Sequence, residues 1–393
     1  MAVDFGSSES VRESFGILKQ PACLCCVANL IGVVMVTIKG SVSSPAVQTE
    51  ALGPDYTISR IINGGWQLAG GHGPVDRDRT IKDFEKFLFA GIDTFDCADI
   101  YTGGESMLGD FIRNVRNRLG TEVSESIKIH TKLVPDLHML KDCDGSYVEK
   151  IINRSLQRLN IDQIHLVQFF WWDLSLGSPI ETMMSLKRLQ TEGKVRYLGV
   201  TNWDAAQISP FVEAGIDIVS AQVQYSLLDH RPEASLVPWC QQNHTKLLCY
   251  GTLAGGFLAE SWLGARDPGF DFENRSLIKY RLVIDEFGGW DLFQALLENL
   301  KECSDKHGAS ISEVAMRYIL EQPQVGAVII GSRNADRLDS TVSVFQFELD
   351  ADDHSAITEI LSGRNGPTGS VYELESDRAG RHGSIMKYDQ NAV

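Results

Sequence analysis

The strongest constraint on the fold is a regular alternation of short apolar runs with longer amphipathic segments from Thr57 onwards. Short apolar runs bounded by turn residues are typical of buried strands, whereas the segments between them have the length and periodicity of helices. Repeated strand–helix units predict a parallel sheet covered by helices. The eight predicted strands are Ile58–Ile62, Ile92–Phe95, Ile127–Thr131, Ile164–Phe169, Val195–Val200, Ile218–Ala221, Leu247–Cys249 and Val325–Ile330.

Eight such units predict an α/β fold of the (β/α)8 TIM-barrel type in a single domain, which takes about 250 residues plus insertions. A doubly wound sheet is the alternative. It is disfavoured because no G-x-G-x-x-G turn follows the first predicted strand. The predicted helices are Arg79–Ala90, Met107–Arg118, Tyr147–Leu159, Ile180–Thr191, Ala205–Ala214, Leu236–Asn243, Trp290–Lys306 and Ile311–Leu320.

We expect the barrel over residues 51–363, preceded by an N-terminal extension, 1–50, and followed by a C-terminal tail, 364–393. The extension carries an apolar run, Ala22–Ile38, which is short for a membrane span. The acidic residues before this run fit neither a secretory signal nor a transit peptide. A membrane anchor, an unusual targeting segment and a non-native gene-model start all remain open for it.

Charge and cysteine usage limit the partners and the compartment. The net charge of −16 repels phosphodiester backbones and anionic lipid headgroups, so nucleic acid is not expected as a partner. The eight cysteines are scattered, mostly in apolar segments, which favours reduced thiols and a cytoplasmic location. A plastid location, or membrane association through residues 22–38, is the alternative, and the sequence gives no oligomeric state.

Three polar residues near the ends of two successive predicted strands form the candidate catalytic group: Asp96, Tyr101 and Lys132. In a barrel, the carboxyl ends of all strands meet at one rim, where active sites lie. A phenol is an effective proton donor only if its phenolate is stabilised, and a nearby ammonium group does this by Coulomb attraction. We therefore predict that Tyr101 is a general acid tuned by Lys132 and kept in place by Asp96.

The chain resembles the aldo-keto reductases over about residues 55–362. The resemblance rests on six motifs in order, namely IDTFDCADIYTGGE from Ile92, HTKL from His130, GKVRYLGVTNW from Gly193, AQVQYSLLD from Ala221, CYGTLAGGFL from Cys249 and VIIGSRNADRL from Val328. It implies NADP-dependent reduction of a small aldehyde, ketone or related carbonyl without a metal. It also implies that Tyr101 is the proton donor, flanked by Lys132 and Asp96.

One family residue is replaced. The family usually places a His after the fourth strand, where this chain reads LVQFFWWD and has Phe170 at that position. His165 cannot substitute, because it lies five residues upstream and faces the other side of an extended strand. Losing one hydrogen-bond donor to the reacting oxygen typically costs about 10²–10³ in rate. The chain is then either a slow or altered reductase, or an NADP-binding regulatory or scaffolding subunit with little turnover.

The resemblance also implies a cofactor site. The carboxamide group of a nicotinamide needs a hydrogen-bond donor and an acceptor, and its flat ring can stack on an aromatic side chain. The side chains that the resemblance implies at the nicotinamide meet both needs. Ser332, Arg333 and Arg337 are expected to begin a helix, where two guanidinium groups on one face would bind a 2′-phosphate and favour NADP. The other implied cofactor residues are Thr201, Asn202, Gln222, Tyr250, Gly251 and Leu253.

The remaining expectations concern the substrate side. Trp66, Phe170 and Trp171 are predicted to line the pocket, which favours an apolar or aromatic substrate. The long segment Phe257–Gly289 is a candidate lid over the cofactor. The tail either covers the mouth of the barrel and shapes the pocket, or is mobile.

Overall fold

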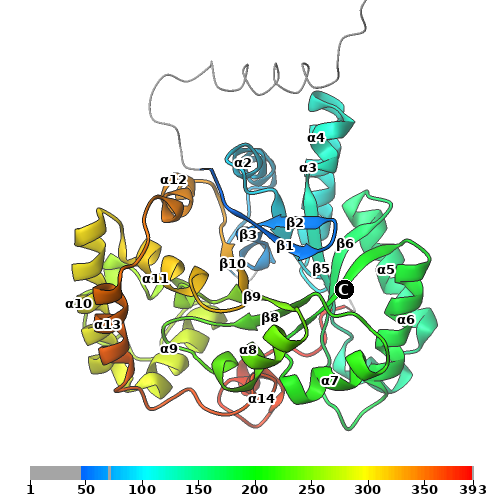
Figure 1. Ribbon diagram of the computed structural model, residues 1–393. Coiled ribbons are helices and arrows are strands. Elements are labelled where there is room, and N and C mark those ends of the chain that lie inside the picture. Colours follow the sequence, from blue (N-terminus) through cyan, green and yellow to red (C-terminus); the bar gives the residue numbers. More distant parts are fainter. Residues whose placement is uncertain (1–45, 70–71, 392–393) are drawn as a thin grey trace, which may run out of the picture. The chain divides into compact units, whose positions relative to one another are not determined.

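The structure is a computed structural model and describes residues 46–69 and 72–391 (Figure 1). Its centre is a closed barrel of eight parallel strands in the order β10-β3-β4-β5-β6-β7-β8-β9, which confirms the predicted (β/α)8 fold. The barrel strands are β3 (Ile61–Gly64), β4 (Thr94–Asp96), β5 (Lys128–Leu133), β6 (Ile164–Phe169), β7 (Val195–Thr201), β8 (Ser220–Gln224), β9 (Lys246–Tyr250) and β10 (Val325–Gly331).

Helices surround the barrel, and the eight that were predicted all occur close to their expected bounds. Short polar side chains begin several of them, because an oxygen of Asp76, Asp144, Ser178 or Ser310 accepts one of the first free backbone N–H groups. The helices are α2 (Arg77–Phe89), α3 (Gly104–Leu119), α4 (Thr121–Glu125), α5 (Gly145–Leu159), α6 (Pro179–Thr191), α7 (Ala205–Glu213), α8 (Pro232–Gln242), α9 (Arg275–Phe287), α10 (Gly289–His307), α11 (Ile311–Leu320), α12 (Leu338–Ser343), α13 (Ala351–Leu361) and α14 (Glu373–Ser376).

The first predicted strand, Ile58–Ile62, is divided between two elements. Its beginning belongs to β2 (Tyr56–Ser59), which pairs antiparallel with β1 (Thr49–Gly53), and its end belongs to the barrel strand β3. The break falls at Arg60, whose guanidinium group donates to the carbonyl oxygens of Leu320, Val325 and Gly326. Both halves are apolar because both are buried, so the sequence pattern could not reveal the break.

The β1–β2 hairpin closes the end of the barrel at which the strands begin. Leu52, Tyr56 and Ile58 pack against residues inside the barrel, including Ile62 and Leu166. The Tyr56 hydroxyl lies 2.9 Å from Nε2 of His130, near the start of β5. Figure 1 shows the hairpin (blue) at one end of the barrel and α14 (red) at the other. The hairpin leaves the opposite end, at the carboxyl ends of the strands, for a functional site.

The predicted N-terminal extension falls almost wholly outside the described residues, so its apolar run, Ala22–Ile38, has no structural description. Among the residues that are described, no helix has the length and apolar character needed to cross a bilayer. The tail belongs to the same compact unit as the barrel, Pro45–Val393. The predicted boundaries at residues 50 and 363 remain predictions.

Gly109 allows α3 to lie against the end of α5, and this contact yields a stability prediction. A Cβ atom at residue 109 would lie 2.1 Å from the carbonyl oxygen of Arg158, a backbone atom that cannot rotate away. We expect Gly109→Ala to lower the free energy of unfolding by about 1–3 kcal/mol through overpacking. Gly145→Ala is the matched control, because its Cβ would meet only the Ser185 hydroxyl, at 3.2 Å. Equal thermal unfolding midpoints for the two variants would contradict this account.

Candidate active site

A buried ion pair between neighbouring strands forms the base of the site. Asp96 is the last residue of β4, and Lys132 lies near the end of β5. The Lys132 Nζ atom is 2.5 Å from Oδ2 of Asp96 and 2.8 Å from the carbonyl oxygen of Cys97. Both side chains are buried, with 6% and 4% of their surfaces exposed. The strand order of the barrel thus brings together two residues that are 36 positions apart.

The second carboxylate oxygen of Asp96 is held by two further strands. Oδ1 accepts hydrogen bonds from Nε2 of Gln168 on β6, at 2.9 Å, and from Nε2 of Gln222 on β8, at 2.8 Å. Both glutamines are buried. Because a buried carboxylate is stable only when its oxygens are hydrogen bonded, these amides keep Asp96 in one orientation beneath Lys132. Sequence analysis placed Gln222 at the cofactor and did not identify Gln168.

Tyr101 lies directly beside this ion pair. The Lys132 Nζ atom is 5.1 Å from the centre of the phenol ring, and the centre of the Trp66 ring is 5.2 Å from it. The loop that carries Tyr101 turns sharply, with the amide of Tyr101 bonded to the carbonyl of Ala98 and that of Gly104 bonded to the carbonyl of Tyr101. The three predicted catalytic residues are therefore together at the mouth of the barrel.

Burial and the attraction between opposite charges have opposite effects on the pKa values of Tyr101 and Lys132. Burial raises the pKa of Tyr101 to about 12, although the ammonium group of Lys132 lowers it. Burial alone would lower the pKa of Lys132, but Asp96 and Tyr101 raise it well above its usual value. Lys132 therefore stays charged and Tyr101 stays protonated at neutral pH. A phenol in this state can donate a proton but is a poor base.

The residues implied at a nicotinamide lie on neighbouring strand ends. Thr201 ends β7, and Asn202 follows it with a left-handed backbone, φ 58°. Oδ1 of Asn202 accepts a hydrogen bond of 2.9 Å from the hydroxyl of Tyr250, at the end of β9. Gly251 also has a positive φ, 71°, and Leu253 follows it in the loop. These residues form a continuous group, but Gln222 uses its amide nitrogen for Asp96.

The prediction that a helix begins at Ser332 is wrong. Helix α12 begins only at Leu338, so Arg333 lies in the preceding loop and Arg337 is at the N-cap position. The two arginines therefore do not share a helix face. Both are exposed, and Nη1 of Arg333 donates to the carbonyl of His72 at 2.7 Å. Ser332 is hydrogen bonded to Asn63 of β3, at 2.9 Å.

Arg333 borders a small hollow at the edge of the mouth. Its volume is about 180 Å³, below the roughly 300–1,000 Å³ of a site for a drug-sized ligand. It could therefore hold one phosphate or sugar group but not a dinucleotide. The lining residues are Leu68, Pro74, Val75, Asp76, Arg79, Thr80, Arg333 and Asn334.

The three predicted pocket residues have different environments. Trp66 faces Tyr101 and donates from Nε1 to the hydroxyl of Ser276, at 3.0 Å. Phe170 is 3% exposed and packs edge-on against Trp172, at 4.7 Å between ring centres. Trp171 is fully buried, and its Nε1 donates to backbone carbonyls of Asp173 and Leu176. Trp171 thus presents no exposed surface to a ligand.

His165 lies at the other end of the barrel, as its spacing predicted. Its ring stacks on Tyr56 of the hairpin at 6.0 Å, and its Nδ1 accepts from the amide of Ile129. It cannot supply the donor that Phe170 lacks.

Two segments cover the mouth and contribute charged residues that sequence analysis did not single out. Helix α9 lies in the predicted lid segment and supplies Lys279, while α14 of the tail supplies Glu375. These two side chains form an ion pair next to Asn202 and Tyr250. The sequence held one weak signal for Lys279, a lysine between Ile278 and Tyr280 in the predicted lid segment.

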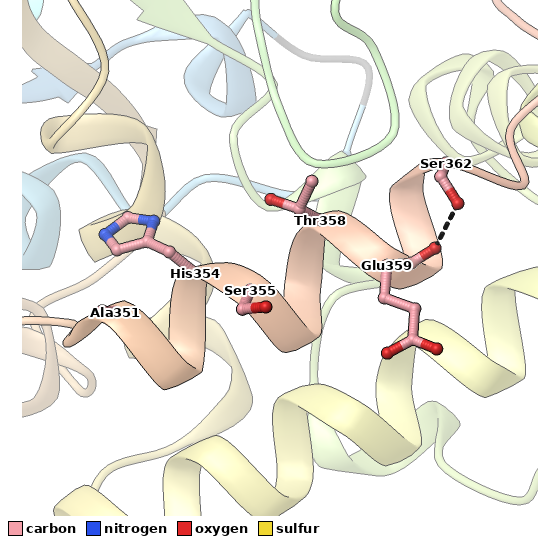
Figure 2. Close-up of a pocket in the computed structure, with 6 residues that line it drawn as sticks. All are labelled: Ala351, His354, Ser355, Thr358, Glu359 and Ser362. Carbon is pink, nitrogen blue, oxygen red and sulfur yellow. Dashed lines mark hydrogen bonds between the residues drawn. The ribbon is translucent and has the colours of Figure 1, made fainter.

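A second hollow lies far from this chemistry. Figure 2 shows it on one face of α13, where Ala351, His354, Ser355, Thr358, Glu359 and Ser362 line it. All six residues belong to one short stretch of chain, and none of the predicted site residues is among them. The hollow is an open surface feature outside the barrel mouth.

Comparison with known proteins agrees with this geometry. The model of the aldo/keto reductase family matches residues 60–362, more than half of the chain. The chain belongs to the aldo/keto reductase family. Members of this family are oxidoreductases that use nicotinamide cofactors. The family match therefore agrees with the (β/α)8 barrel.

The individual relatives have low sequence identity to this chain. The chain is 27% identical over 326 residues to the NADH-specific methylglyoxal reductase of Escherichia coli, covering 78% of this chain and 95% of that protein. It is 26% identical over 262 residues to flagellar radial spoke protein 5 of Chlamydomonas reinhardtii, covering 57% of this chain and 49% of that protein. The structure of a glycerol dehydrogenase from Gluconobacter oxydans has a TM-score of 0.69 at 24% identity, covering 83% of this chain and 98% of that one. At that identity the structural match shows the fold alone.

Proposed function

We propose that this protein is an NADP(H)-dependent oxidoreductase that reduces a small aldehyde, ketone or related carbonyl, with Tyr101 as proton donor. The observation that carries the proposal is the position of Tyr101 beside the buried pair of Lys132 and Asp96, at the barrel mouth. The relatives named as reductases support the reaction class. The aromatic ring of Trp66, beside Tyr101, favours an apolar or aromatic substrate.

The proton transfer follows from the charges around Tyr101. Its hydroxyl, protonated at neutral pH, would donate to the substrate oxygen as that oxygen gains negative charge. Lys132 stabilises the resulting phenolate, and Asp96 keeps Lys132 charged and directed at the ring. The nicotinamide, when bound, supplies the hydride. The chain's own groups thus provide the proton and the electrostatic stabilisation.

The residues near Tyr250 fit such a cofactor. Tyr250 offers an aromatic plane, and its hydroxyl is fixed by Asn202 at 2.9 Å. The amide of Asn202 has the donor and the acceptor that a carboxamide group requires. Arg333, which borders the hollow beside β10, and Arg337, which is also exposed, support a 2′-phosphate and hence NADP(H) over NAD(H). The Escherichia coli relative named NADH-specific makes this preference the point that most needs testing.

A second candidate is a cofactor-binding regulatory or scaffolding subunit with little turnover. Phe170 favours it, because an apolar ring stands where the family usually places a second donor. The relative named as a flagellar radial spoke protein gives it further support. The two candidates differ in whether turnover by the protein depends on Tyr101.

The first prediction concerns Tyr101→Phe. The change should lower the rate of carbonyl reduction by about 10²–10⁴-fold without altering cofactor affinity, since only the proton donor is lost. NADPH oxidation would be followed with a panel of aldehydes and ketones. Background rates for both proteins would favour the subunit instead.

The pH profile tests the same group independently. Because the pKa of Tyr101 is raised to about 12, its proton is retained throughout the neutral range. Reduction should therefore be insensitive to this group between about pH 6 and 9, whereas alcohol oxidation, which needs the phenolate, should rise about tenfold per pH unit. An oxidation rate that levels off near neutral pH would contradict the assignment.

Cofactor preference is tested with Arg333→Ala combined with Arg337→Ala. Loss of charged hydrogen bonds to a 2′-phosphate should weaken NADPH binding by about tenfold or more and leave NADH binding unchanged. Binding would be measured by quenching of tryptophan fluorescence. Arg116→Ala, an exposed arginine in the last turn of α3, is the matched control. Equal losses for NADPH and NADH would show that the arginines do not select NADP(H).

Phe170→His tests whether the lack of a second hydrogen-bond donor to the substrate oxygen limits the rate. If the second hydrogen bond to the substrate oxygen limits the rate, its restoration should raise carbonyl reduction by up to about 10²–10³-fold. Phe170→Leu is the control, since it changes the packing against Trp172 without adding a donor. A rate that rises equally in both variants would assign the effect to pocket shape.

A further inference from the structure

The C-terminal tail is tied down on two sides of the barrel mouth. At its beginning, the amide of Val371 donates to Oδ1 of Asp204, which follows β7, at 3.1 Å. At its end, the amides of Gln390 and Asn391 donate to Oδ1 of Asp136, which follows β5, at 2.7 and 2.8 Å. Helix α14 lies between these attachments (Figure 1). The tail therefore crosses the mouth and does not extend away from the barrel.

Aromatic residues of the tail pack against Phe170, the residue at the position where the family usually has a histidine, and against its neighbours. The ring of Tyr372 lies 6.2 Å from that of Phe170 and 5.6 Å from that of Trp203. Tyr388 packs edge-on against Trp172, at 4.7 Å. These contacts bury apolar surface on both sides, which stabilises the covered state.

One residue of α14 reaches the group of residues that the proposed function assigns to the nicotinamide. The carboxylate of Glu375 accepts from Nδ2 of Asn202, at 3.1 Å, and forms an ion pair with Lys279 of α9. The side chains of Lys279 and Glu375 are only 9% and 15% exposed. Burial alone would raise the pKa of Glu375, but Lys279 holds it below its usual value, so the pair stays charged.

Lys279 covers one face of the Tyr250 ring. Its Nζ atom lies 5.0 Å from the ring centre of Tyr250, in a cation–π contact. The hydroxyl of Tyr250 is in turn bonded to Oδ1 of Asn202. Both polar atoms of the Asn202 amide and one face of the Tyr250 ring are thus occupied by groups of the chain itself.

We propose that the ion pair between Glu375 and Lys279 is an autoinhibitory contact that closes the nicotinamide site, so that cofactor binds only when the tail releases Asn202 and Tyr250. This inference rests on the proposed function, because it takes Asn202 and Tyr250 as nicotinamide contacts. The affinity observed for a cofactor is reduced in proportion to the fraction of molecules in the open state. The strength of the contact then sets how much cofactor the protein needs.

The test compares cofactor binding by the full-length protein and Glu375→Gln. Loss of the carboxylate leaves Lys279 buried without a counter-charge, which destabilises the closed state. We expect the dissociation constants of NADPH and NADH both to fall by about tenfold or more, since the open fraction rises for either cofactor. Arg381→Gln is the matched control, because it removes an exposed ion pair between the tail and Asp285 of α9 and keeps the contact between Glu375 and Asn202. It should leave both constants unchanged.

Hydrogen exchange supplies a readout that does not depend on a substitution. In the wild-type protein, amides of the tail that bond to Asp204 and Asp136, such as those of Val371 and Asn391, should be protected without cofactor. Saturating NADPH should increase their exchange if the tail must leave. Tighter binding by Glu375→Gln together with this loss of protection would support the proposal.

The contrary outcomes separate the two hypotheses. Equal affinity of wild type and Glu375→Gln, with tail protection unchanged by bound NADPH, would overturn the autoinhibitory contact and leave the proposed function standing. Binding of neither cofactor by either protein would overturn the proposed function and the contact with it.

Discussion

The buried ion pair between Lys132 and Asp96 is the interaction on which the rest of the site depends. Two charges removed from water are stable only when they are paired and hydrogen bonded, and here the ion pair and its two glutamine partners come from four different strands. Gln168 and Gln222 hold Asp96 from β6 and β8, which neighbour neither β4 nor each other. Closure of the barrel is therefore a condition for the charge arrangement beside Tyr101.

This arrangement has a chemical consequence for Tyr101. Because Asp96 neutralises much of the charge of Lys132, burial dominates and the pKa of the phenol is raised to about 12. The ammonium group stabilises a developing phenolate without removing the proton beforehand. A site of this kind is suited to proton donation near neutral pH, which is the role that carbonyl reduction requires.

The C-terminal tail packs on Phe170 and on the aromatic residues beside it. The side chain that replaces the family's usual histidine is apolar, and the aromatic residues of the tail pack on it and on its neighbours. Phe170 and Trp172 thus provide an apolar surface on which the segment that carries Glu375 packs.

The sequence by itself determined the barrel and the grouping of Asp96, Tyr101 and Lys132, because apolar periodicity defines strands and helices, and strand ends in a parallel barrel share one rim. Only the tertiary structure decided three other features. The break at Arg60 was hidden because both sides of it are buried. The helix after β10 begins only at Leu338, and the loop before it contains Arg333, which donates to the carbonyl of His72. The pairing of Lys279 with Glu375 joins residues 96 positions apart from two irregularly placed segments. Such a contact leaves no periodic signal, since it depends on where the folded barrel brings the two segments together.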